Sequence, residues 1–300
     1  MFRKLLIPLD GSSLAERVLP AAAALAAKTS VPLTLLHVLE KRAKAQIHAD
    51  RHLTAADEAE SYLRQLASRL SPDLQVDWHV HMDRVGDVAR SIVEHADEVG
   101  AGLIAITTHG AGGLSRILFG SIAEQVLTRC GRPVLLSPVQ YAGPTDVFPC
   151  RQILVPVDIG PGHDQGPELG LRLAAACGAA LTLVAVAPTF TSLEGRRTTA
   201  AQLQPAATLA LLEIEAEQLA EQLRVTEDQA RQLGVAVAAL LLRGHPAECL
   251  LRAIADAHPD LVVFASHARK GVDALLDPGV GQQLCARSRA HLLVLPIAAT

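Results

Sequence analysis

The two halves of this chain repeat the same sequence pattern. Residues 5–10 read LLIPLD and residues 153–158 read ILVPVD, an offset of 148 positions. The segment LTLLHV at 33–38 returns as LTLVAV at 181–186 with the same offset. Repeats of this length correspond to duplicated domains and not to solenoid units. A chain of 300 residues is also about the size of two ordinary domains.

The repeat continues further along the chain with a longer offset. LIAITTH at 103–109 matches LVVFASH at 261–267, and RPVLLSP at 132–138 matches AHLLVLP at 290–296, each pair 158 positions apart. The second copy therefore carries ten additional residues in its middle part.

Within each half, short apolar segments alternate with helical patterns. The segments are apolar without a polar alternation, which is typical of strands covered on both faces. A βαβα alternation predicts a parallel sheet with helices on both faces. In the first half we expect strands near 3–9, 33–39, 75–81, 102–108 and 133–137, and helices near 13–28, 55–70, 86–99 and 121–130.

We therefore predict an α/β fold of two tandem, doubly wound, parallel five-stranded sheets of the Rossmann-like type. The two domains would cover residues 1–140 and 150–300, and the segment 141–149, which contains glycine and proline, would link them. We interpret 40–54 and 187–207, which have little apolar periodicity, as loops.

The composition argues against nucleic-acid and membrane partners. The chain has 27 basic and 31 acidic residues and no long basic segment. Aromatic residues make up 3% of the chain, too few for the stacking platforms of single-strand binders. The apolar N-terminal run is too short for a signal peptide, and no segment reaches the roughly 18 apolar residues of a membrane span. We expect a cytoplasmic protein with neither kind of partner.

The five cysteines are scattered along the sequence. No two of them form a C-x-x-C pair, and cysteine and histidine together do not form a zinc spacing. We interpret them as free thiols in a reducing cytosol and predict no metal-ligating residues. They are Cys130, Cys150, Cys177, Cys249 and Cys285.

The segment with the most chemical information is TTHGAGGLSRILFGSIA at 107–123, which follows a predicted strand. It ends at Gly120-Ser121, where a helical pattern begins with Ser121 as a candidate N-cap. The amides and dipole of a helix N-terminus attract phosphate, and glycines let the backbone approach a ligand closely. The segment is neither a P-loop nor a dinucleotide fingerprint, so glycine spacing alone leaves a phosphate site and a tight turn both open.

Gly110, nine further residues and then Gly120-Ser121 resemble the signature of the universal stress protein family. IPLDGSS at 7–13 resembles the first strand and turn of the family, and the resemblance extends over both halves. Thr107 stands where the family has the opening glycine of its signature, and Gly102 stands where it has an acidic residue. A tandem arrangement is familiar in that family, and its fold is similar to that of the adenine nucleotide alpha hydrolases.

The resemblance implies that ATP, ADP or AMP binds at the carboxyl ends of the first-half strands, with Mg²⁺ accompanying the phosphates. Open α/β sheets in general bind ligands at this edge. The residues implied in binding, from the nucleoside pocket to the phosphate cradle, are Pro8, Leu9, Asp10, Val38, Ile106, Thr107, His109, Gly110, Gly113, Gly120, Ser121 and Ile122.

Four of these residues have alternative interpretations. Asp10 could cap the turn that follows it, and Val38 could be an ordinary core residue. His109 recurs as His267 in the second half, which favours a structural histidine. Thr107 could crowd the ribose with its β-branched side chain or contact the ligand through its hydroxyl.

The second half departs from the signature. Ala268 replaces Gly110, and Pro278 removes a backbone amide from the expected cradle, so we expect no nucleotide there. The resemblance also implies that the last strands, 133–137 and 291–295, pair with each other and make the two domains an intramolecular pseudo-dimer. A further homodimer of the whole chain is left open.

The leading hypothesis is a nucleotide-binding regulatory protein of the stress response. We identify no catalytic residue, because the sequence shows neither an activated nucleophile nor a carboxylate pair for metal-assisted hydrolysis. Two alternatives stay open, namely a slow ATPase or adenylate-forming relative and a structural interaction module that binds no nucleotide.

Overall fold

The computed structural model describes residues 1–41, 46–47, 50–108, 121–138, 147–160, 162–193, 196–267 and 279–297. Within these ranges the side chains of 46, 47, 51, 121, 196 and 267 are not described.

The first half forms a five-stranded parallel arrangement with helices between the strands. Its strands are β1 (Leu5–Pro8), β2 (Leu33–Glu40), β5 (Val76–Val85), β6 (Leu103–Thr108) and β7 (Val134–Pro138). Its helices are η1 (Ala15–Val18), α1 (Leu19–Thr29), α2 (Ala56–Arg69), α3 (Val88–Glu98) and α4 (Ser121–Arg129). The strand order is β7-β6-β1-β2-β5 with all neighbours parallel, so the winding reverses between β1 and β6. The predicted α/β class and strand positions are confirmed.

The second half repeats this arrangement. Its strands are β8 (Gln152–Val157), β9 (Ala180–Ala187), β10 (Val237–Arg243), β11 (Leu261–His267) and β12 (His291–Ile297), in the order β10-β9-β8-β11-β12. Its helices are α5 (Gln165–Cys177), η2 (Phe190–Ser192), α6 (Arg196–Leu203), α7 (Pro205–Gln232), α8 (Pro246–Ala257) and α10 (Val280–Arg287). Much of the additional length lies in α7, which has 28 residues where α2 has 14.

The two segments interpreted as loops contain regular structure, so that interpretation was wrong in part. The first holds a small antiparallel hairpin of β3 (Gln46–Ile47) and β4 (Asp50–Arg51). The second holds η2 and α6, which begin after a capping box between Thr189 and Ser192. Among the described residues, Leu193 and Ala201 of this segment form a small buried cluster with Leu212 of α7, too few apolar positions to give a periodic signal.

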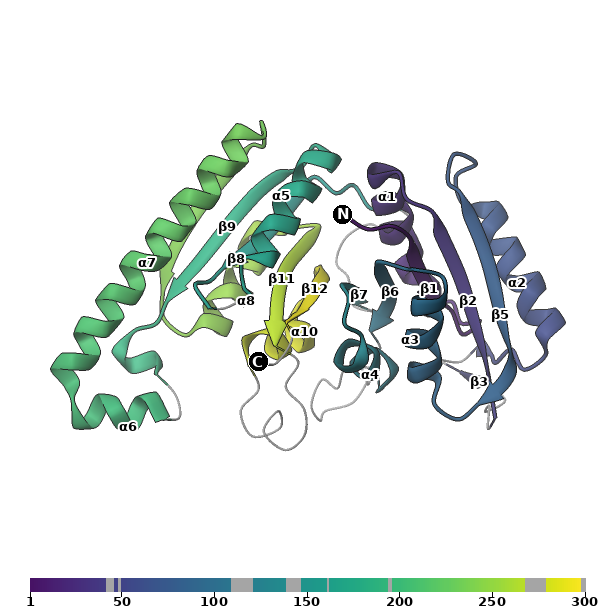
Figure 1. Ribbon diagram of the computed structural model, residues 1–300, viewed down its shortest axis with the longest axis horizontal. Helices are drawn as coiled ribbons and strands as arrows, with labels where there is room; N and C mark the ends of the chain where they lie inside the picture. Colours follow the sequence, from purple (N-terminus) through teal and green to yellow (C-terminus); the bar gives the residue numbers. More distant parts are fainter. Residues whose placement is uncertain are drawn as a thin grey trace.

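The last strands of the two halves pair with each other, as the sequence predicts. β7 and β12 are antiparallel, with Leu135 opposite Leu293 and with flanking pairs on both sides. The two five-stranded sheets therefore merge into one sheet of ten strands, and the two strands meet in the middle of the molecule (Figure 1). Each strand pairs with backbone N–H and C=O groups of the other that would otherwise be unpaired at a sheet edge.

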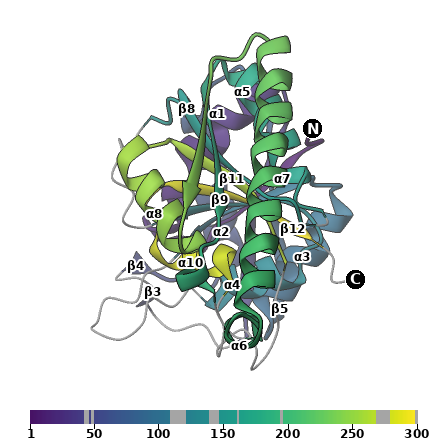
Figure 2. The same ribbon diagram turned by 90° about the vertical axis from the view of Figure 1, so that its left-hand side faces the viewer.

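Because the sheet is continuous, each of its faces carries one core that extends across both halves. One core contains buried residues of α1, α2, α5 and α7, and the other contains buried residues of α3, α4, α8 and α10. At the junction, Leu135 and Leu293 belong to the first core, whereas Leu136 and Leu292 belong to the second. Figure 2, turned by 90° from Figure 1, shows α7 in front of the strands of its half.

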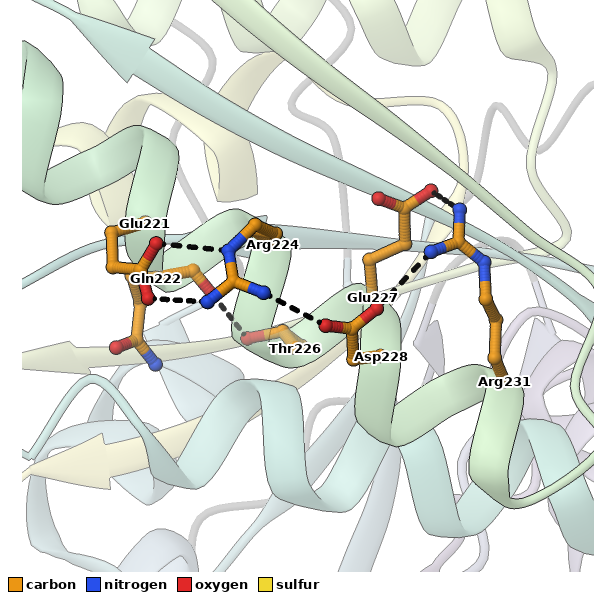
Figure 3. Close-up of polar contacts among 7 residues, drawn as sticks. All are labelled: Glu221, Gln222, Arg224, Thr226, Glu227, Asp228 and Arg231. Atoms are coloured by element: carbon orange, nitrogen blue, oxygen red, sulfur yellow. Dashed lines mark hydrogen bonds and ion pairs between the residues drawn. The ribbon is translucent and has the colours of Figure 1, made fainter.

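Toward its C-terminal end, the long helix α7 has a charged outer face, whereas its N-terminal part exposes Leu209, Leu211 and Ile214. Arg224 bonds Glu221 and Asp228, and Arg231 bonds Glu227 and Asp228, at separations of three and four residues (Figure 3). Solvent screens exposed pairs of this kind, so each contributes little to stability. On the inner face the buried residues are Leu212, Ala216, Leu219, Leu223, Thr226 and Ala230. In the part of the chain that the structure describes, no helix is both long enough and apolar enough to cross a membrane.

The junction predicts how an isolated half would behave. Residues 1–140 expressed alone would expose β7, so we expect them to dimerise through that edge, because a second copy can satisfy the same backbone groups. Sedimentation velocity of this fragment beside the full chain would measure the association. A fragment that folds and stays monomeric at high concentration would contradict the prediction.

The segment that enters the second half is anchored on the junction strand. The ring of Phe148 packs edge-on against His291, with 5.1 Å between centroids, and both side chains are buried. Burial lowers the pKa of His291 to about 4, since a buried imidazolium loses its hydration.

This depressed pKa predicts a loss of stability in acid. The unfolded chain binds a proton at His291 near pH 6.5, but the folded chain binds it only near pH 4. The contribution of His291 to the free energy of unfolding is therefore fully present above pH 6.5 and is lost as the pH falls from 6.5 to 4. At about 1.4 kcal/mol per pKa unit, the His291 contribution is about 3 kcal/mol. Urea unfolding of the wild type and of His291→Phe between pH 7 and 4 would measure it. The same pH dependence of the free energy of unfolding in both proteins would contradict this assignment.

Candidate functional site

Six of the predicted site residues converge where the winding of the first half reverses. Leu9 and Asp10 follow Pro8 at the end of β1, while Ile106 and Thr107 lie near the end of β6, the neighbouring strand. Val38 lies near the end of β2, on the other side of β1. In open α/β sheets, ligands bind outside the carboxyl ends of the strands at such a reversal.

The turn after β1 holds the carboxylate of Asp10 in a fixed position. Asp10 Oδ1 accepts hydrogen bonds from the backbone N–H of Ser12 at 2.9 Å and from its hydroxyl at 2.6 Å. Ser12 Oγ in turn accepts from the N–H of Ala15 at 3.1 Å, at the start of η1. Asp10 therefore does cap the turn, as one interpretation expected. This role orients the carboxylate and is compatible with a ligand contact.

Glycine is required in this turn for two reasons. Gly11 has φ = +90°, and a Cβ at this position would lie 2.7 Å from Leu53 Cγ. Leu53 is therefore packed against the turn backbone. His37 connects the same two elements, since its Nδ1 lies 2.8 Å from the Leu9 carbonyl oxygen and its Nε2 lies 3.3 Å from the Leu53 carbonyl oxygen.

Burial keeps two titratable groups beside this turn in their neutral forms. Desolvation lowers the pKa of His37, so the imidazole is neutral and donates through one nitrogen, for which the shorter Nδ1 contact to Leu9 is the better candidate. Burial and the nearby carboxylates of Glu16 and Asp10 raise the pKa of Tyr62 on α2. His37 and Tyr62 thus act as neutral hydrogen-bonding groups beside this turn.

The segment Asp50–Thr54 contacts both the turn and the end of β2. Asp50 Oδ2 accepts from the N–H and the hydroxyl of Ser13, at 2.7 and 2.9 Å. His52 is 4% exposed, its Nε2 lies 3.9 Å from Glu40 Oε1, and its Nδ1 has no hydrogen-bond partner among the described residues. The sequence analysis missed His37, Asp50 and His52. A histidine inside the apolar strand segment LTLLHV was the one available signal.

Thr107 uses its hydroxyl to hold η1 against the sheet. Its side chain is 1% exposed, and Oγ1 donates to the Ala15 carbonyl oxygen at 3.2 Å. Ser137 at the end of β7 makes a similar, longer contact with the Arg17 carbonyl oxygen at 3.5 Å. The residue that replaces the family's glycine therefore has a structural partner within the protein.

This contact predicts a cost for removing the hydroxyl alone. Thr107→Val keeps the β-branched shape but leaves a buried carbonyl without its donor, so we expect a loss of about 1–2 kcal/mol in the free energy of unfolding. Thr108→Val is the matched control, because Thr108 Oγ1 lies 3.4 Å from its acceptor, the Ser137 carbonyl oxygen, in a less buried position. Urea titrations that give equal losses for the two variants would contradict this assignment.

Some of the predicted site residues belong to the core, and others lie outside the described ranges. Val38 and Ile106 are each 7% exposed and belong to the core beneath α3 and α4, and Ile122 packs against that core. Ser121 is the first residue of α4. His109, Gly110, Gly113 and Gly120, together with the side chain of Ser121, lie outside the described residues.

The second half fills the equivalent position differently. Asp158 Oδ2 lies 3.1 Å from His163 Nδ1, and Oδ1 accepts from the N–H of Ile159 at 2.8 Å. Two glycines bring α5 directly onto the strands, since a Cβ at Gly166 would lie 3.1 Å from the backbone N of Ala265 and one at Gly170 would lie 2.4 Å from a Val155 methyl. The space between α5 and the strands at these points does not admit a methyl group.

Comparison with known proteins agrees with the duplicated architecture. The model of the universal stress protein family matches residues 1–138 and again residues 149–296. The chain belongs to the universal stress protein family. Its tandem form is reflected in a solved universal stress protein from Archaeoglobus fulgidus, which is 19% identical, covers 98% of both chains and has a TM-score of 0.69.

Two curated universal stress proteins match only part of this one. Universal stress protein YxiE of Bacillus subtilis is 26% identical over 148 residues, which is 45% of this chain and 99% of the relative. Universal stress protein MJ0531 of Methanocaldococcus jannaschii is 29% identical over 139 residues, which is 45% of this chain and 82% of the relative. These relatives correspond in length to about one half of the tandem protein.

Proposed function

We propose that this universal stress protein binds one adenine nucleotide, in its first half, and has a regulatory role in the stress response. The observation that carries the proposal is the fixed Asp10 carboxylate, which follows β1 at the point where the winding reverses between β1 and β6, with α4 following β6 in the chain. The nucleoside would lie against Pro8, Leu9, Asp10 and Val38.

The described wall of this site fits a nucleoside in one further respect. A buried polar atom without a partner is costly, and His52 Nδ1, next to Leu53 and the β1 turn, has none among the described residues. A hydroxyl or ring nitrogen of a nucleoside would satisfy it. The acidic groups Asp10, Glu16 and Asp50 near this turn also suit an uncharged base better than a second anion.

The phosphates would lie at the start of α4. A helix N-terminus offers free amides and a favourable dipole, and the glycine-rich sequence from Gly110 to Gly120 lets the backbone approach an anion closely. His109, Gly113, Ser121 and Ile122 are the further residues that we assign to this end of the site, beside Ile106 and Thr107. Mg²⁺ would be held largely by phosphate oxygens and water, as is usual for this ion.

The second half would act as a structural partner. The contact of Asp158 with His163 and the close packing of α5 favour a site that binds no nucleotide. We propose domains at 1–140 and 150–300 that form an intramolecular pseudo-dimer through β7 and β12, which pair antiparallel.

Matched variants of the two halves test this assignment. We expect Asp10→Asn to weaken ATP binding at least about tenfold, because it removes a charge-assisted hydrogen bond while Oδ1 can still accept from Ser12. Asp158→Asn should leave the affinity unchanged. Isothermal titration with ATP and Mg²⁺ would measure both affinities and the stoichiometry, and mass spectrometry of small molecules released on denaturation would identify the bound nucleotide. Two equivalent sites per chain, or equal effects of the two variants, would overturn the proposal.

A further inference from the structure

Two cysteine side chains that are distant from the nucleotide site lie together at the start of the second half. Cys150 lies two residues before the first residue of β8, and Cys177 is the last residue of α5. Gly178 ends α5 in the left-handed region, with φ = +66°, and the chain then enters β9. The N–H of Ala180 donates to the Arg151 carbonyl oxygen at 2.8 Å, so the end of α5 is brought beside the start of β8.

The two thiols interact with each other and differ in environment. Cys150 is 1% exposed, and its interaction with Cys177, together with burial, raises the pKa of its thiol. The same interaction lowers the pKa of Cys177, which partial burial opposes and the ammonium group of Lys28 on α1 supports. Cys177 is also partly exposed to solvent. Cys177 is therefore the thiol of the pair that solvent and a small oxidant can reach, whereas Cys150 is buried behind it.

The backbone at Cys150 is held in an unusual conformation. Its φ is +45°, in a region that non-glycine residues seldom occupy. The two following N–H groups, of Arg151 and Gln152, both donate to Asp260 Oδ2, at 2.7 and 3.0 Å. This carboxylate fixes the chain directly after Cys150. Non-glycine residues in this region cluster at functional sites, where the surrounding structure maintains the strain.

We propose that Cys150 and Cys177 form a peroxide-reactive dithiol site, in which Cys177 is oxidised first and Cys150 resolves it to a disulfide. The thiolate of Cys177 attacks one oxygen of a hydroperoxide, the O–O bond breaks, and a sulfenic acid forms as hydroxide or alkoxide leaves. The Cys150 sulfur then attacks the sulfenic sulfur, the new S–S bond forms and water departs with the thiol proton. Two thiols are thereby oxidised by two electrons, and one peroxide is reduced.

The other cysteines differ from this pair. Burial raises the pKa of Cys130 and of Cys285, which opposes thiolate formation. Cys249 Sγ donates to the Arg243 carbonyl oxygen at 3.7 Å and is partly exposed, as Cys177 is. Cys249 is thus a matched control of similar access with a carbonyl in place of a thiol partner.

The experiment uses the full chain treated with hydrogen peroxide, blocked with N-ethylmaleimide and mapped by peptide mass spectrometry. We expect a Cys150–Cys177 cross-link, with a mass about 2 Da below that of the two free peptides for the two hydrogens lost. Cys150→Ser should instead accumulate a sulfenic acid at Cys177 that dimedone traps. Cys177→Ser should abolish the cross-link, and Cys249→Ser should leave it unchanged.

A kinetic measurement tests the chemistry in a protein that retains both thiols. We expect Cys177 to react with maleimide at neutral pH several-fold faster than Cys249, and Lys28→Met to slow that reaction without changing the thermal unfolding midpoint. An equal or slower reaction of Cys177, or a disulfide that forms between other cysteines first, would overturn the proposal. ATP titration of the oxidised chain is a separate measurement, so loss of the nucleotide proposal would leave this one intact.

Discussion

The antiparallel pairing of β7 with β12 is the interaction on which the rest of the architecture depends. A doubly wound sheet with the order seen in each half would end at an unprotected strand that carries apolar side chains on both faces. Because β7 and β12 pair, neither of them is an edge strand. The pairing also brings Leu135 and Leu293 into one core and Leu136 and Leu292 into the other. The helices of one half then pack on a sheet that the other half completes.

Much of this could be predicted from the sequence, because repetition and apolar continuity are strong signals. The offsets of 148 and 158 located corresponding strands, and LLIPLD and LIAITT indicated buried parallel strands. Small elements were missed where their stability comes from contacts distant in sequence. The hairpin β3–β4 lies in a segment whose Asp50 bonds Ser13, 37 residues earlier, and local sequence carries no sign of such a partner.

The candidate site was likewise predictable from the sequence only in part. The turn role of Asp10 followed from an acidic residue before Gly-Ser, whereas the contact of Thr107 with the Ala15 carbonyl required knowledge that η1 packs on β6. His37 and His52 lie in positions that look like core and loop in the sequence, and only the fold brings both beside the β1 turn. The motif residues therefore indicate where the candidate site lies. Residues that tertiary packing brings together form the rest of its wall.

The junction between β7 and β12 also has a consequence for how this protein can change over time. In a dimer of identical chains, every substitution occurs at both symmetry-related positions, and dilution separates the partners. Here the two partner strands belong to one polypeptide, so their effective concentration is set by the connecting segment and does not depend on expression level. One copy is free to acquire the His163–Asp158 contact and the packed α5 while the other keeps the Asp10–Ser12 turn. A single gene thereby obtains an asymmetric assembly that a homodimer cannot encode.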